Sequence, residues 1–219
     1  MAIDTYISKQ YVLCTLFPHG KKNIFEHNLV KRTCVTFAGV WDLLMFRRIG
    51  LDEKDVPEIR FPLTDNLLFL SPLYDYISKS KHIKYNKIIE NFVLTSGSLF
   101  DEYINRTVDI LVKEESLSPT MKVGLFKTET VTPPKMAAFE SIIETIKNEA
   151  VAAQPMNEQL YILNSLLIKT GFLKNYYLKA EADNLISKME NTKKAEHTPL
   201  VHKFIHEMEP DLWDIIKNT

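Results

Sequence analysis

Apolar residues at helical spacing, in a chain with very little glycine, constrain the fold most strongly. From position 100 onward, inward-facing residues recur at intervals of 3, 4, 7, 8 and 11, namely Phe100, Tyr103, Ile104, Thr107, Val108 and Leu111. This period places them along one face of an α-helix. Only 6 glycines occur in 219 residues, so proline, asparagine and serine must make many of the turns. The sequence therefore predicts an α-rich fold.

Similar patterns with start and stop signals predict about eight helices. Asp4 is the expected cap of the first helix, Gly50 is expected just past the end of the second, and Gly171 is expected to close a later one. The expected ranges are about 4–17, 31–49, 71–80, 85–94, 98–111, 135–153, 157–170 and 172–189. A C-terminal helical segment is expected to open at Thr198 and Pro199.

Extended structure is predicted in two places only. Residues 58–63 alternate in polarity and permit a short strand, which Pro62 would place at a sheet edge. Two extended runs, 123–126 and 127–131, lie between Pro119 and the pair Pro133-Pro134. They predict a β-hairpin over 122–131 that projects from the helical body. The expected fold is mainly α, a single compact multi-helix domain with one small β-hairpin.

The domain prediction divides the chain near residue 190. Residues 1–190 are expected to form the helical domain. Residues 191–219 are expected to form a linker and a C-terminal helical segment packed on that domain, because the stretch from Glu190 to Glu196 is mostly polar.

Charge and cysteine content limit the class of protein. Lysine and arginine total 27 and the carboxylates 28, so no chain-wide field attracts nucleic acid and no nucleic-acid partner is expected. Cys14 and Cys34 lie within apolar helical patterns, which favours buried, reduced thiols. No secretory signal and no run of about 20 apolar residues is present. We expect a cytoplasmic protein whose membrane contact would be peripheral.

The sequence contains no strong catalytic signature. Phosphate-binding glycine loops, the nucleophile elbow, paired cysteines and the zinc-protease motif are all missing. We therefore expect no cofactor, no catalytic residue and no enzyme activity. His202 and His206 lie four apart on an expected helix and are weak candidates for a metal site, although surface histidines explain this spacing better.

Basic residues gather in two places. Lys21, Lys22, Lys31 and Arg32 surround the first loop, where an exposed Phe25 could enter a bilayer interface while the cations meet anionic headgroups. The second group is Lys79, Lys81, Lys84 and Lys87. An ordinary solvated surface is the alternative explanation for either group.

The order of these features resembles the Golgi phosphoprotein 3 family. The likeness spans residues 5–190 and rests on the order of the segments. An early helix (6–17) is followed by a charged aromatic loop (21–25) and by a long helix whose last part is 41–49. A further helix (105–114) then precedes the hairpin (122–130), and two later helical segments (135–150 and 160–173) follow it. Eukaryotic members of that family are helical proteins that bind phosphatidylinositol 4-phosphate and retain glycosyltransferases in the Golgi. The resemblance implies a divergent, non-Golgi-like relative.

The resemblance also implies a lipid-phosphate site that is poorly retained. The family places a tryptophan in the first loop, where this chain has Phe25. The family's helix arginine falls near Thr36, and of its later arginines only Arg106 matches. The candidate lipid or phosphate residues are Lys21, Lys22, Phe25, Lys31, Arg32 and Arg106. Val123, Leu125 and Phe126 of the hairpin are candidates for self-association or for contact with another protein.

These inferences lead to one expected function and two alternatives. The expected function is a binding or adaptor module, related to the phosphoinositide-binding Golgi phosphoproteins and peripheral to anionic membranes. The first alternative is a helical enzyme with a dispersed site, for example around a metal ion. The second is a nucleic-acid binder in which the hairpin over 123–131 and a helix form a winged-helix-like unit.

Overall fold

The computed structural model describes residues 6–123 and 129–218, with side chains described over 6–121 and 131–217. Its helices are α1 (Ile7–Leu16), α2 (Asn23–Glu26), α3 (Leu29–Met45), α4 (Ser71–Lys79), α5 (Tyr85–Thr95), α6 (Gly97–Lys113), α7 (Met136–Val151), α8 (Glu158–Lys169), α9 (Phe172–Tyr176), α10 (Lys179–Thr192), α11 (Pro199–Lys203) and α12 (Glu209–Asn218), with a 3-10 helix at Asp65–Leu70 and a π-helical turn at Phe204–Met208. The strands are β1 (Ile49–Leu51), β2 (Pro57–Ile59), β3 (Met121–Val123) and β4 (Glu129–Val131). The predicted mainly α class is confirmed.

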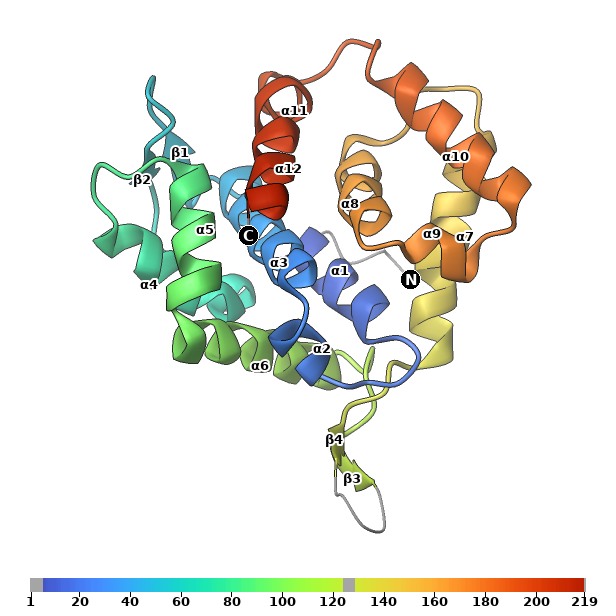
Figure 1. Ribbon diagram of the computed structural model, residues 1–219, viewed down its shortest axis with the longest axis horizontal. Coiled ribbons are helices and arrows are strands. Elements are labelled where there is room, and N and C mark those ends of the chain that lie inside the picture. The colour runs from blue at the N-terminus through green and yellow to red at the C-terminus, as the bar shows by residue number, and fades with distance from the viewer. Residues whose placement is uncertain (1–5, 124–128, 219) are drawn as a thin grey trace.

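Helix α1 lies at the centre of the molecule. Every one of its ten residues is buried, and the helix packs against α3, α6, α7 and α8. Figure 1 shows α1 and α3 in the middle, with α4, α5 and the first sheet to one side and α7 to α10 to the other. A helix that is buried on all sides has no solvent-facing side on which polar residues would collect. This explains why its sequence lacks a clear amphipathic stripe.

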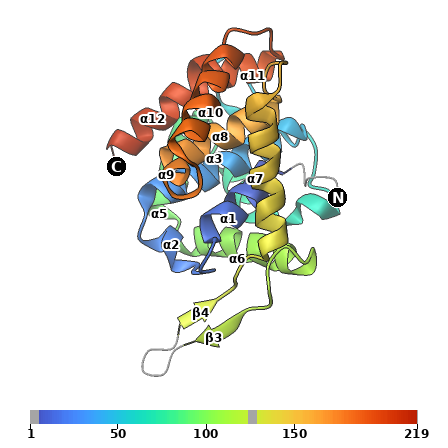
Figure 2. The same cartoon turned by 90° about the vertical axis from the view of Figure 1, so that its right-hand side faces the viewer.

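Two antiparallel two-stranded sheets accompany the helices. In the first, Ile49 pairs with Ile59, which confirms extended structure at the start of the predicted 58–63 strand. In the second, Met121 pairs with Val131, so the predicted hairpin forms. Figures 1 and 2 show this second hairpin extending below α6, away from the helical body.

The predicted end of the second long helix is wrong by one turn. Helix α3 ends at Met45 rather than Ile49, and Ile49 begins β1. Arg47 takes the left-handed backbone conformation, with φ of 55°, and the Arg48 amide closes the helix by donating to the Leu43 carbonyl oxygen at 2.8 Å. Gly50, expected at this place, instead lies in the strand.

The predicted single helix over 172–189 is wrong as well, because the chain turns between α9 and α10. Tyr177 is extended, with φ of −127° and ψ of 141°. Glu181 accepts a hydrogen bond from the Leu178 amide at 2.9 Å and so begins α10. The turn lets α10 pack along α7, whereas a straight continuation of α9 would not.

The C-terminal helical segment packs on the central helices. Its Phe204 is fully buried, and the ring lies 5.4 Å from that of Trp41 and 5.6 Å from that of Phe37, both on α3. Aromatic pairs at these separations add to the free energy of burial. Across the described residues, no helix is long and apolar enough to cross a bilayer.

Candidate functional site

The basic loop between α1 and α3 is attached to the base of the projecting hairpin. The Gly20 carbonyl oxygen accepts a hydrogen bond from the Thr132 amide at 2.9 Å, and the Gly20 amide donates to the Leu16 carbonyl oxygen at 2.7 Å. Gly20 has φ of +65°, and a Cβ at this position would lie 2.4 Å from the Thr132 carbonyl carbon. Glycine is needed here because any larger residue would push the loop off the hairpin.

The prediction that Phe25 is an exposed loop tip is wrong. Phe25 exposes 1% of its surface and belongs to the hydrophobic core. The reason is the short helix α2, whose single turn directs Phe25 inward while Asn23 and Glu26 remain exposed. No aromatic side chain of α2 is therefore available to enter a bilayer.

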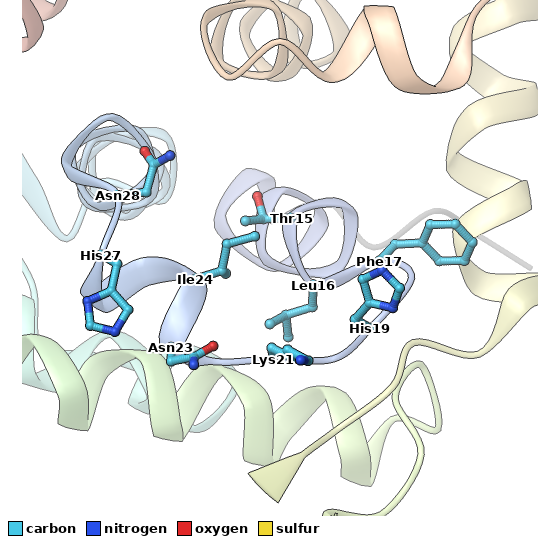
Figure 3. A pocket seen from close by; sticks show the side chains of 9 residues that line it. All are labelled: Thr15, Leu16, Phe17, His19, Lys21, Asn23, Ile24, His27 and Asn28. Atoms are coloured by element: carbon cyan, nitrogen blue, oxygen red, sulfur yellow. The ribbon is translucent and has the colours of Figure 1, made fainter. Parts of the chain in front are cut away.

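A pocket of about 320 Å³ opens beside this loop. Figure 3 shows Lys21 and His19 at one end of it and His27 with Asn28 at the other, with Leu16 and Ile24 between them. The polar lining consists of cation, imidazole, amide and hydroxyl groups, from Thr15, His19, Lys21, Asn23, His27 and Asn28. These groups donate hydrogen bonds and suit an anionic oxygen better than a cation.

The four cationic residues predicted around the first loop do not converge on this pocket. Only Lys21 lines it. The Lys22 Nζ donates to the Asn105 Oδ1 at 2.7 Å. Lys31 lies half-buried near the start of α3, where burial lowers the pKa of its amino group.

Arg32 is held in place by an aromatic ring. Its guanidinium lies 4.0 Å from the centre of the Phe100 ring, a cation–π contact. Burial lowers the pKa of Arg32, and the nearby carboxylates of Asp101 and Glu26 act in the opposite direction. Arg32 therefore has a structural role in joining α3 to α6.

Arg106 is already engaged by its neighbours on the protein. Its Nη2 and Nε donate to the Glu102 Oε1 at 2.7 and 2.9 Å, and its Nη1 donates to the Ser71 Oγ at 2.9 Å. Arg106 is not among the residues lining the loop pocket. Three of its five N–H donors are therefore used within the protein, and the Glu102 carboxylate beside them would repel a phosphate.

The remaining predicted site residues fall into two groups. Val123 lies in β3, while Leu125 and Phe126 lie outside the described residues, so a role of the hairpin in self-association stays a prediction. The exposed rings of His202 and His206 lie 4.3 Å apart. Within the described part of the chain, no group of three or more histidine, cysteine or acidic residues could hold a metal ion.

No protein-family model matches the chain, and the search of curated proteins found no match to its sequence.

The sequence patterns did not reveal Thr15, Asn23 and Asn28 as pocket residues. Asn28 could have been recognised as the residue that caps α3, because asparagine is a preferred capping residue. In the structure its side chain accepts a hydrogen bond from the Lys31 amide. Thr15 carried none, because its place in the pocket depends on how α2 folds back over the end of α1.

Proposed function

We propose that the chain is a non-catalytic binding module, an adaptor that attaches peripherally to anionic membranes through the basic loop between α1 and α3 together with Lys31 and Arg32 at the start of α3. The attachment of Gly20 to Thr132 carries this proposal, because it holds the loop against the base of the projecting hairpin, and Lys21 and Lys22 follow Gly20 directly in the chain. Residues 18–32, the loop and the first residues of α3, carry four cationic side chains against one carboxylate, Glu26, whereas the whole chain has a net charge of −1.

The proposed attachment is electrostatic and tolerant of headgroup chemistry. With Phe25 buried, no aromatic wedge adds to the attraction. Each lysine close to an anionic surface contributes about 1 kcal/mol, so the loop can support weak adsorption without a dedicated lipid pocket. The engagement of Arg106 by Glu102 supports the same conclusion, since that guanidinium is compensated within the protein. The resemblance to the Golgi phosphoprotein 3 family supports contact between the basic loop and anionic headgroups. The burial of Phe25 and the pairing of Arg106 with Glu102 argue against that family's specific phosphate site.

Cosedimentation with liposomes that mix phosphatidylserine and phosphatidylcholine tests the proposal. The double variant Lys21→Glu with Lys22→Glu should lower the affinity by at least about thirtyfold, since two favourable charges of about 1 kcal/mol each are removed and reversed. Arg106→Ala should weaken binding less. Added salt should weaken wild-type binding, and phosphatidylinositol 4-phosphate should bring little extra affinity.

A second pair of lysines supplies the matched control. Lys79→Glu with Lys81→Glu makes the same charge change at two exposed positions at the end of α4, and it should leave most of the binding intact. Equal losses in the two double variants would show that net charge, not the loop, controls adsorption. Wild-type protein that binds no anionic liposome would refute membrane attachment.

A further inference from the structure

A second pocket, of about 620 Å³, lies where α1, the end of α6 and the start of α7 meet. Figure 2 shows α7 crossing in front of α1, with α6 below them. This volume falls within the range of small-molecule sites in proteins. None of the predicted site residues lines it.

The surface of this pocket is mainly apolar, although the buried polar residues Lys9 and Gln10 also line it, and its side toward α7 is built from small residues. Leu13 of α1, Leu111 of α6 and Ile142 of α7 are buried side chains that line it. Ala137, Ala138 and Ser141 of α7 complete that side, and none of them has a side chain long enough to fill the space. Phe139, between them in sequence, turns away and stacks on Phe17 with ring centres 3.7 Å apart.

The charges of the pocket are arranged unevenly. The Lys9 Nζ, whose side chain is 2% exposed, pairs with the Glu114 Oε1 at 2.5 Å, so this buried charge is already compensated. Two more lysines line the pocket with exposed side chains, Lys113 and Lys135, against the single carboxylate of Glu115. The Glu115 side chain is 82% exposed and its Oε2 lies 3.4 Å from the Lys135 Nζ, an ion pair that solvent weakens. The exposed rim therefore has a surplus of positive charge.

We propose that this pocket binds a small amphiphile with an apolar body and a single anionic head group. The apolar body lies against Leu13, Leu111 and Ile142, and the head group remains at the rim with Lys113 and Lys135. A cationic head group would face the surplus positive charge, and a second charged group would have to enter an apolar interior at a high desolvation cost. This site is separate from the basic loop, so it does not depend on membrane attachment.

Titration calorimetry with decanoate below its micelle concentration, and with decanol as the uncharged counterpart, tests the proposal. We expect saturable binding of one decanoate per chain and at least about tenfold weaker binding of decanol, the contribution of a partly exposed charge interaction. Absence of saturable decanoate binding, or equal affinity for decanol, would overturn the proposal.

Two variants with matched controls locate the site. Ala137→Phe adds a large side chain at an exposed position of the pocket and should abolish binding, whereas Val151→Phe, exposed at the far end of α7, should not. Lys113→Glu with Lys135→Glu should weaken decanoate at least about tenfold and leave decanol unchanged, unlike Lys174→Glu with Lys179→Glu at exposed positions elsewhere. Circular dichroism and thermal melting check that each variant is folded. Decanoate binding that survives Ala137→Phe would place the ligand elsewhere and refute the assignment.

Discussion

The buried carboxylate of Asp42 joins the first helix to the third. Its Oδ1 accepts a hydrogen bond from the Ile7 amide at 2.9 Å, and its Oδ2 accepts from the Ser8 amide at 3.0 Å and from the Ser8 hydroxyl. These amides open α1, where a negative charge is favoured. The expected cap, Asp4, lies outside the described residues. A carboxylate more than thirty positions away therefore binds the first free amides of α1.

Replacement of this carboxylate should destabilise the protein. Asp42→Asn retains the shape but removes the charge and one acceptor, so we expect a loss of about 2 kcal/mol in the free energy of unfolding. Urea denaturation followed by circular dichroism measures the loss. Asp214→Asn, at an exposed position of α12, is the control and should change stability little. An Asp42→Asn protein as stable as wild type would show that these hydrogen bonds are redundant.

Lys169 is a buried cation with a measurable consequence for alkaline stability. Its side chain is 1% exposed. The Lys169 Nζ lies 3.7 Å from the Glu209 Oε1 and 3.4 Å from the centre of the Trp213 ring. Burial lowers the pKa of Lys169 from 10.5 to about 8, against the attraction of Glu209. Between these two pH values the unfolded chain binds a proton that the folded chain has released.

The stability contribution of Lys169 should therefore increase with pH. From pH 8 to pH 10.5, wild type should gain on the order of 2 kcal/mol of unfolding free energy relative to Lys169→Met, and below pH 8 the difference should be constant. Denaturant titrations of both proteins across this range measure it. The exposed Lys174→Met variant should run parallel to wild type. A parallel Lys169→Met curve would contradict the lowered pKa.

At the scale of elements, the contact between the basic loop and the hairpin depends on Gly20. Gly20→Ala would bring a Cβ within 2.4 Å of the Thr132 backbone at a left-handed φ. We expect a loss of at least about 2 kcal/mol in unfolding free energy, because backbone atoms cannot yield as a flexible side chain can. Thermal and urea unfolding measure it.

Gly97 offers a matched control for this substitution. It begins α6, and a Cβ there meets no atom within 4 Å. Gly97→Ala should change stability by no more than about 0.5 kcal/mol, or raise it slightly by restricting the unfolded chain. Similar losses at both glycines would mean that the contact with Thr132 does not position the loop.

At the scale of the whole molecule, both thiols are enclosed by the packed helices. Cys14 and Cys34 are free and buried. Burial raises the pKa of Cys14 far above its usual value and the pKa of Cys34 to about 12. Since the thiolate is the nucleophile, both burial and the raised pKa suppress reaction.

Thiol labelling should therefore report global unfolding. Under native conditions each cysteine should react at least about a thousandfold more slowly than in the urea-unfolded chain. Mass spectrometry of the chain after timed exposure to a maleimide reagent resolves the two sites. Fast labelling of either thiol in native buffer would show that its helix opens locally.

The sequence by itself determined the helical class, the hairpin near 122–131, the end of α8 before Gly171 and the burial of both thiols. These features depend on local spacing, turn residues and prolines, which act over a few positions. Only the tertiary structure decided that Phe25 points into the core, that Asp42 caps α1 and that the chain turns at Tyr177. It also decided which side chains line the two pockets. Each of these depends on which helix faces meet, and contacts between residues far apart in the chain leave no periodic signal in the sequence.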